Sequence, residues 1–488
     1  MVPTDRTISL RPYWTKDNPA LVEAITCFSD ERFSAGKTHA SAVERWTGAG
    51  PIPVFTAVPF FGFDDASEFA AIIDSFAEAA ARAVAESGKG APRAFPLLAM
   101  PVIGSGGGGG AEVLGDLIRV VLEAAECAAA RHLVDIVIVV RSAAQMGLAQ
   151  RIRRENSHNR WNELPADLKQ TANELAADCV SGNVVPFLGA GISISAGAPS
   201  WPALVSQLTT EVADQLTDAE KSSLAAKGPL DQAEILKNLY PTPEAFNKAV
   251  AELVNKTAYG LAPTLIANLP LDQAITLNYD ELFEIASNDS GHKCAVIPGD
   301  ENSEASRWLL KMHGQVSDAS TIVLTRSDYL GFDANRNVLA ALVKASLVTK
   351  RLVFIGFGLG DDHFHQILHD VREVSPESIA HRAIALTLTD DSLEQKAWKN
   401  KITLQPMSPH GTATATAGRV LEIFLDYLLM LSTDSREYLL DPAFDTQLTV
   451  PERRLKELVS AIYELKHESD DPTVAAAAAA IGRFGPNS

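Results

Sequence analysis

The stretch of residues 184–201, which reads VVPFLGAGISISAGAPSW, constrains the fold more than any other part of the chain. Its first five residues are apolar, as in a buried strand of a parallel sheet. Gly189 and Gly191 then predict a tight turn that leads into a helix. Such a turn lets the backbone approach a diphosphate, because glycine has no Cβ and the free N–H groups at a helix start point at an anion.

This turn departs from the common dinucleotide-binding fingerprint. That fingerprint has a third glycine at a fixed spacing and an acidic residue roughly 20 positions later, at the end of a second strand. Residues 202–258 instead have a helical pattern, with breaks at Gly228-Pro229 and at residues 241–243. A tight turn that binds no ligand is therefore the open alternative.

Short apolar runs alternate with helical patterns over the rest of the central region, which predicts a doubly wound parallel sheet. The predicted strands are residues 274–277, 309–312, 321–324, 352–355 and 383–388. Asn278, His313 and Gly356 directly follow three of these strands. Open parallel sheets bind ligands at the carboxyl ends of their strands, so these residues and their neighbours are candidate site residues.

Three segments join the glycine turn in a recognisable set: AITLNYDELFE (274–284), LLKMHGQVSDASTIVLTRSDY (309–329) and RLVFIGFGLGDDHFHQIL (351–368). In this order they resemble the sirtuin family, and in particular the sirtuin-like bacterial proteins of anti-phage defence that hydrolyse NAD. The resemblance covers residues 170–425. It implies a Rossmann-like catalytic domain at residues 169–425, in which the helical region 202–258 is an insertion that covers the NAD.

The resemblance implies catalytic roles for Asn278, His313 and Asp280. The amide of Asn278 would position a water or a ribose hydroxyl, and His313 would accept a proton. Asp280 would bond the nicotinamide amide and stabilise positive charge on the ribose. For Asn278 and Asp280 the alternative is capping of the next helix, and for His313 it is a structural histidine at a strand end.

The same resemblance implies a larger set of residues that contact NAD. They are Gly189, Ala190, Gly191, Ile192, Ser193, Pro199, Trp201, Asn278, Tyr279, Asp280, Gly356, Phe357, Gly358 and Asp362. No metal is expected, although His365 and His369 lie one helical turn apart beside His363. No zinc is expected either, because the four cysteines include no Cys-x-x-Cys pair.

A smaller α/β domain is predicted at residues 1–155, from strands at residues 54–58, 96–103 and 135–140 and helices at 68–86 and 114–132. Its glycine loop at residues 104–110 makes it loosely similar to macro-type domains that bind ADP-ribose. A degenerate domain that mediates assembly is the alternative. A polar linker is predicted at residues 156–168 and a short helical extension at 426–488, with helices at 419–431, 452–466 and 475–480.

The composition excludes several classes of protein. The chain has 488 residues and a formal net charge of -19, which argues against broad nucleic-acid binding and against binding to an anionic membrane. It has neither a secretory pattern nor an apolar run long enough to span a membrane, and its few cysteines fit a reducing compartment. A cytoplasmic protein is expected.

The sequence therefore predicts an NAD glycohydrolase that produces ADP-ribose and nicotinamide in anti-phage defence. Such an enzyme must be silent until it is triggered, so the expected partners are further copies of the chain, a co-encoded defence protein such as a translocase ATPase, or a nucleotide signal at the N-terminal domain. A non-catalytic NAD or ADP-ribose sensor is the first alternative. A protein deacylase is the second, and the missing zinc cysteines and Ser200-Trp201, where deacylases have an acidic-aromatic-arginine triplet, argue against it.

Overall fold

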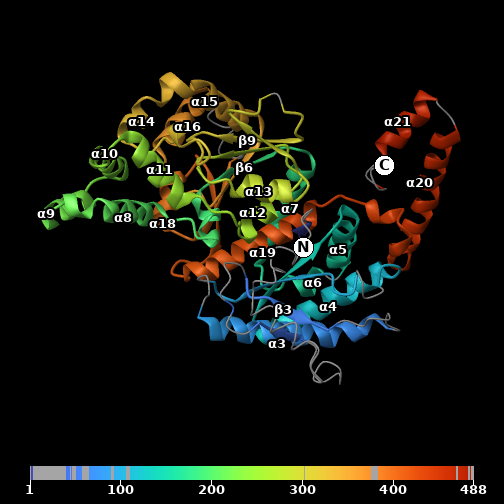
Figure 1. The fold of residues 1–488 in the computed structure, drawn as a ribbon. Coiled ribbons are helices and arrows are strands. Elements are labelled where there is room, and N and C mark those ends of the chain that lie inside the picture. Colours follow the sequence, from blue (N-terminus) through green and yellow to red (C-terminus); the bar gives the residue numbers. More distant parts are fainter. Residues whose placement is uncertain are drawn as a thin grey trace. The chain divides into compact units, whose positions relative to one another are not determined.

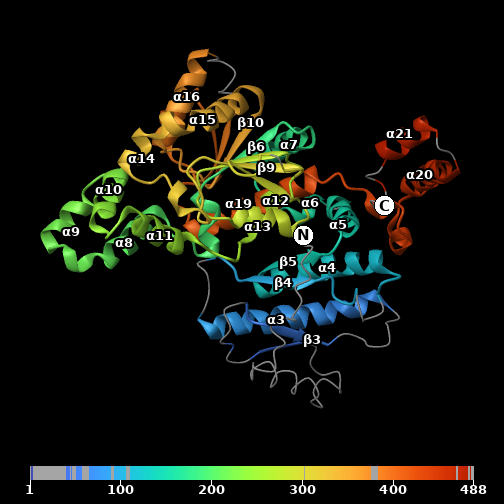
Figure 2. The same ribbon diagram turned by 45° about the horizontal axis from the view of Figure 1, so that its top comes forward.

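The computed structural model describes residues 2–3, 40–43, 46, 51–57, 65–88, 93–105, 110–155, 157–301, 303–374, 383–468, 471–481 and 484. They form two compact units, drawn from two directions in Figures 1 and 2. Glu163–Ser432 make up the sheet unit. Met1–Asn162 together with Thr433–Ser488 make up the terminal unit.

A seven-stranded parallel sheet forms the centre of the sheet unit, with the strand order β12-β11-β10-β6-β7-β9-β8. The strands are β6 (Val184–Leu188), β7 (Gln273–Thr276), β8 (Cys294–Ile297), β9 (Arg307–Lys311), β10 (Arg351–Ile355), β11 (Ile384–Thr389) and β12 (Thr403–Ser408). All neighbouring strands are parallel. The predicted doubly wound parallel sheet is confirmed.

Helices cover both faces of this sheet (Figures 1 and 2). On one face, α15 (Phe332–Thr349) and α16 (Asp362–Val374) pack on Phe187 and Phe354 of the two central strands. The other face carries α7 (Ala166–Val180), α12 (Leu261–Ala267), α13 (Leu282–Asp289) and α19 (Thr414–Ser432), and α19 packs on α7 and α12. Burial on both faces explains why β6 is apolar throughout and β10 is apolar after Arg351.

The helical insertion has a hydrophobic core of its own. It consists of α8 (Trp201–Glu211), α9 (Asp218–Ala225), α10 (Pro229–Leu239) and α11 (Pro243–Val254). Leu236, Phe246 and Val250 are fully buried within it. Because proline is well tolerated in the first turn, α10 and α11 begin at the predicted breaks, which are confirmed.

The predicted strand at residues 321–324 is wrong. These residues follow a 3₁₀ turn, η5 (Ala319–Thr321), and they pair with no strand. The apolar run that predicted a strand has another cause, because Ile322 and Leu324 enter the core of the helical insertion whereas Val323 enters the core under α15 and α16. Strands β8 and β12 were not predicted.

The terminal unit contains a three-stranded parallel sheet, in the order β1-β5-β4, and a two-stranded antiparallel pair, β2-β3. The strands are β1 (Val2–Pro3), β2 (Ala40–Ala42), β3 (Val54–Thr56), β4 (Leu97–Pro101) and β5 (Asp135–Val140). The helices α3 (Phe69–Ser87) and α4 (Leu114–His132) agree with the two predicted helices, and they are followed by α5 (Ala143–Glu155) and the single turn α6 (Ser157–Arg160). Much of the glycine loop, residues 106–109, lies outside the described residues.

The C-terminal segment belongs to this unit and does not form a tail of its own. It contains the 3₁₀ turns η6 (Glu437–Leu439) and η7 (Pro442–Gln447) and the helices α20 (Val450–Glu468) and α21 (Pro472–Ala480). Tyr438 and Phe444 are fully buried, and η6 and η7 pack on α5 and α4. The residues 426–432 that were assigned to the extension instead complete α19 in the sheet unit.

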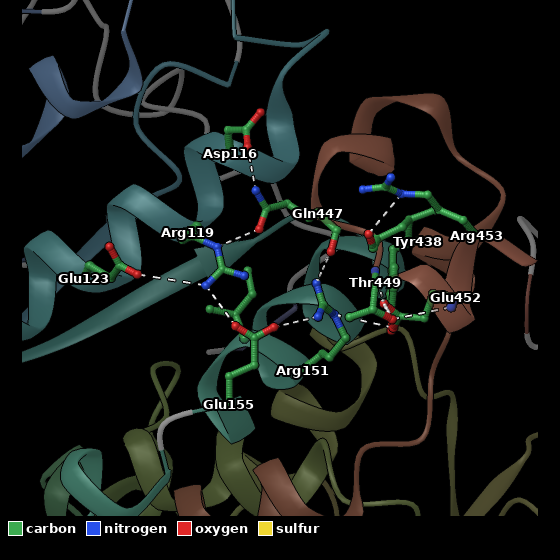
Figure 3. A network of polar contacts seen from close by, with 12 residues as sticks. Asp116, Arg119, Glu123, Arg151, Glu155, Tyr438, Gln447, Thr449, Glu452 and Arg453 are labelled. Atoms are coloured by element: carbon green, nitrogen blue, oxygen red, sulfur yellow. Dashed lines mark hydrogen bonds and ion pairs between the residues drawn. The ribbon is translucent and has the colours of Figure 1, made fainter.

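A polar network ties the C-terminal segment to α4 and α5 (Figure 3). The side chain of Gln447 accepts a hydrogen bond from Arg119 Nε at 2.6 Å and donates one to Asp116. Arg151 donates to the backbone carbonyl of Gln447, and Tyr438 donates to Glu452 at 2.7 Å.

Nowhere in the described part of the chain is a helix both long and apolar enough to span a lipid bilayer.

We expect Phe444→Ala to destabilise the terminal unit by about 3–5 kcal/mol, because a fully buried phenylalanine is lost and a cavity remains. Hydrogen exchange of the α4 amides should accelerate accordingly. Leu458→Ala is the control, since Leu458 on α20 is 60% exposed and its loss should change stability by less than about 0.5 kcal/mol. Unchanged α4 exchange in Phe444→Ala would contradict this packing.

Candidate active site at the carboxyl edge of the sheet

The four segments singled out in the sequence each begin in one of four adjacent central strands, β10, β6, β7 and β9, and continue past its carboxyl end. Their register is level, because Leu188 of β6 pairs with Ile355 on one side and with Thr276 on the other, and Thr276 pairs with Lys311 of β9. The chain continues from β6 to β7 on one side and returns to β10 on the other side. Ligands bind at such a switch point in open α/β sheets.

The glycine turn after β6 does not open directly into an α-helix. Two short 3₁₀ turns, η2 (Ala190–Ile192) and η3 (Ile194–Ala196), precede α8. The N–H groups of Gly189 and Gly191 donate to the carbonyls of Ile355 and Gly356, at 3.0 and 2.9 Å. The expectation that free N–H groups at a helix start point at an anion is therefore wrong for these two residues.

These glycines are required by the contact between two loops. A Cβ on Gly189 would lie 2.4 Å from the carbonyl oxygen of Gly356, and one on Gly191 would lie 2.7 Å from Gly356 Cα. Gly356 itself has a φ of +64°, and its Cβ would meet Ile192 N at 2.6 Å. Gly358, in contrast, has no atom within 4 Å of the place where its Cβ would be.

Asn278 and Asp280 lie against the glycine turn. Asn278 Nδ2 donates to the carbonyl of Gly189 at 3.0 Å, so it does not act as the predicted helix cap. Its Oδ1 accepts no hydrogen bond from the described residues. Asp280 Oδ2 accepts from the buried hydroxyl of Ser193 at 2.9 Å, and its Oδ1 accepts from the N–H of Leu282 at 3.2 Å at the start of α13. Asp280 therefore joins the turn to the next helix.

A buried lysine that sequence reasoning missed holds the loop after β7 through hydrogen bonds to its backbone carbonyls. Lys311 is 1% exposed, and its ammonium donates to the carbonyl of Asp280 at 2.5 Å and to Glu284 Oε1 at 2.6 Å. Burial raises the pKa of Glu284, and the charge of Lys311 opposes this shift. A signal was present in the sequence, because Lys311 is the one charged residue in the apolar run before His313.

His313 lies at the end of β9 in an aromatic pocket. It is 3% exposed, and its ring packs edge-on against Tyr329 and Phe332 at 5.3 and 5.9 Å between centroids. Its Nε2 lies 3.1 Å from Nδ1 of His363. Burial lowers the pKa of His313 to about 4, with smaller contributions from Asp361, which opposes the shift, and from His363 and Arg336. His313 is therefore a neutral imidazole at neutral pH.

The histidines of α16 separate into two classes. His363 is buried beside His313, whereas His365 and His369 are exposed on the helix surface. Potential ligand atoms of His313, Asp361 and His363 lie within 4.8 Å of one another. Both carboxylate oxygens of Asp361 are already engaged, by the Tyr329 hydroxyl at 2.6 Å and the Phe364 N–H at 3.0 Å.

The other residues predicted to contact NAD differ in exposure. Ala190, Gly191, Gly358 and Asp362 are exposed, Pro199, Trp201, Tyr279, Gly356 and Phe357 are half-buried, and Ile192 and Ser193 are buried. Two of the aromatic residues are committed to internal packing. The hydroxyl of Tyr279 donates to the carbonyl of Val323 at 2.8 Å, and the ring of Phe357 packs on Phe187. The indole nitrogen of Trp201 is buried and has no hydrogen-bond partner among the described residues.

Residues 272–407 match a family model described as "SIR2-like domain". Over 231 residues, 44% of this chain, the sequence is 28% identical to "Defense-associated sirtuin 2" of Bacillus subtilis, of which 22% is covered. Over 209 residues, 40% of this chain, it is 28% identical to "NAD(+) hydrolase ThsA" of Enterococcus faecium, of which 41% is covered. The chain thus spans less than half the length of these relatives. A crystal structure of a SIR2 homolog–NAD complex aligns over 52% of this chain and 93% of its own, with 13% identity and a TM-score of 0.32.

We expect Gly189→Ala and Gly358→Ala to differ sharply in stability. The first places a Cβ against the Gly356 carbonyl and should lower the free energy of unfolding by about 1–3 kcal/mol. The second places a Cβ in open space and should change it by less than about 0.5 kcal/mol. Thermal unfolding of the two variants measures the difference, and equal melting temperatures would refute the structural role of Gly189.

We expect His313→Gln to flatten the loss of stability on acidification. Between about pH 6.5 and 4 the unfolded chain binds a proton at this histidine and the folded chain does not, so stability rises with pH in this window. The residue accounts for about 3 kcal/mol of that rise. The free energy of unfolding in urea, measured across this pH range for wild type, His313→Gln and the exposed-site control His369→Gln, tests this contribution. The same dependence on pH in wild type and His313→Gln would disprove it.

Proposed function

We propose that this chain is an NAD glycohydrolase, which cleaves NAD to ADP-ribose and nicotinamide and depletes NAD in anti-phage defence. The observation that carries the proposal is that Asn278 and His313 end neighbouring strands at the switch point of the sheet. The name of the relative from Enterococcus faecium, an NAD(+) hydrolase, supports this activity, and the name of the relative from Bacillus subtilis supports a role in defence.

The reaction breaks the C–N bond between ribose and nicotinamide through a transition state with positive charge on the ribose. Nicotinamide leaves as a neutral molecule, so the reaction needs no acid to protonate it. The site must orient the ribose, place a water and accept the proton that this water loses. Asn278 suits the first two tasks, because the Gly189 carbonyl fixes its amide and leaves Oδ1 as an acceptor. Neutral His313 suits the third task, and Asp280 would stabilise the cation or bond the carboxamide.

Two features support NAD as the ligand of this edge. The indole nitrogen of Trp201 is a buried donor without a partner among the described residues, and a bound ligand with an acceptor would satisfy it. Gly358 is exposed, and no internal contact requires a glycine there. A close approach of bound NAD to the backbone of Gly358 would explain why a glycine is present at this position. Gly358→Ala should then weaken NAD binding without loss of stability.

The activity must be controlled, because NAD depletion harms the cell that carries it. We propose that the terminal unit holds the sheet unit inactive until a trigger arrives, and that the protein acts in the cytoplasm. A macro-like fold that binds a nucleotide, self-assembly and a co-encoded defence protein such as a translocase ATPase are candidates for the control.

The decisive experiment measures NAD consumption and the release of nicotinamide and ADP-ribose by the full chain. Asn278→Ala should lower kcat by roughly 100-fold or more, because a positioned polar group in the transition state is lost. Asn173→Ala, at an exposed position of α7, is the matched control and should retain activity. Undiminished cleavage by Asn278→Ala would refute the site, and NAD binding without cleavage by wild type in infected-cell extract would favour the sensor.

A further inference from the structure

The hydrogen bonds around His313 determine which of its nitrogens carries the proton. His363 Nε2 lies 3.1 Å from the backbone carbonyl oxygen of Tyr329. A carbonyl only accepts, so Nε2 of His363 carries a hydrogen, and in the neutral ring its Nδ1 has a lone pair. That Nδ1 lies 3.1 Å from His313 Nε2 and must accept from it. His313 is therefore the Nε2–H tautomer, and its basic nitrogen is Nδ1.

The ring of His363 is fixed from both sides. It stacks on the ring of Tyr329, with 4.1 Å between the ring centroids and an interplanar angle of 10°. It also stacks on the ring of Phe332, with a centroid distance of 3.9 Å and an interplanar angle of 27°. The hydroxyl of Tyr329 donates to Asp361, which caps α16 by accepting from the N–H of Phe364. Burial raises the pKa of Tyr329, so this hydroxyl keeps its proton. A rotated His363 would lose the Tyr329 carbonyl bond and leave a buried polar group without a partner, which is unfavourable.

We propose that His363 is a positioning residue, which holds His313 in the Nε2–H tautomer and thereby presents Nδ1 to the reacting water or ribose hydroxyl. The proposal rests on the proposed glycohydrolase. Water attacks the ribose carbon as the C–N bond breaks, and nicotinamide leaves as a neutral molecule. A proton of the attacking water passes to His313 Nδ1. His313 becomes a cation, which later releases this proton to solvent. Throughout, Nε2–H stays bonded to His363.

A metal ion is the competing use of this cluster, because His313, Asp361 and His363 bring ligand atoms within 4.8 Å. Each of the two nitrogens of His363 and each of the two oxygens of Asp361 already has a hydrogen-bond partner. A metal bound by His363 would have to displace one of the two hydrogen bonds of this ring, either to His313 or to the Tyr329 carbonyl. The hydrogen-bonded arrangement needs no such change.

Two variants of His363 separate positioning from mere packing. His363→Phe keeps an aromatic ring between Tyr329 and Phe332 but removes the acceptor, and we expect kcat for NAD cleavage to fall by roughly 100-fold with little change in KM. His363→Asn offers Oδ1 near the place of Nδ1, and it should recover kcat to within about tenfold of wild type. His369→Phe, at an exposed position of the same helix, should not change kcat. Equal kcat in wild type and His363→Phe would overturn the proposal.

The tautomer can be observed directly in the resting full-length protein. With ring-¹⁵N-labelled histidine and with His313 assigned by its loss in His313→Gln, the spectrum should show Nε2–H and a bare Nδ1 for wild type and His363→Asn. His363→Phe should show a mixture of tautomers. A proton on Nδ1 in wild type, or zinc binding by wild type that both His363 variants lose, would overturn the proposal. A wild type that cleaves no NAD even in infected-cell extract would instead refute the glycohydrolase, and the tautomer could still be tested because the spectrum does not depend on turnover.

Discussion

The buried ammonium of Lys311 fixes the loop on which the candidate site depends. A charge inside a protein is tolerated only when other groups compensate it, and removal of one partner of a buried pair is destabilising by about 3–5 kcal/mol. Here the compensation comes from Glu284 and from the carbonyls of Tyr279 and Asp280. A lysine deprived of these partners would leave an uncompensated buried charge, whereas the loss of one neutral hydrogen bond leaves only a neutral group unpaired. Lys311 lies two residues before His313, and it therefore couples the backbone positions of the two catalytic candidates.

The glycines of the motif are placed as the sequence predicts, but for a different physical reason. Glycine at the end of a strand suggested a backbone that a phosphate approaches. At Gly189 and Gly191 the approaching group is instead the protein's own Gly356 loop, with two backbone hydrogen bonds and no room for a Cβ. Glycines at a strand end indicate that another group approaches the backbone closely, but they do not indicate whether that group is a ligand or another part of the protein. Among these glycines, Gly358 keeps the original interpretation, because its surroundings in the described chain are open.

The central strands could be predicted and the edge strands could not. β6 and β10 are buried on both faces, so β6 is apolar throughout and β10 is apolar after Arg351. β8 and β12 are the two edges of the sheet. β12 reads TLQPMS, in which polar residues interrupt the apolar pattern, as an edge strand tolerates. The false strand at residues 321–324 has the opposite cause, since its alternating residues fill two different cores without any ladder of hydrogen bonds.

The same distinction applies to the site. Asn278 and His313 could be singled out as candidates because they follow strands whose ends meet at one edge of a parallel sheet, which is a consequence of topology. The partners that set their chemistry are not local: His363 lies 50 residues beyond His313, and Lys311 lies 27 residues beyond Glu284. No periodicity encodes such pairs, because only the folded sheet brings them together. In His313 the two effects combine, since the strand end supplies the imidazole, whereas burial and His363 decide that it is neutral and which nitrogen is basic.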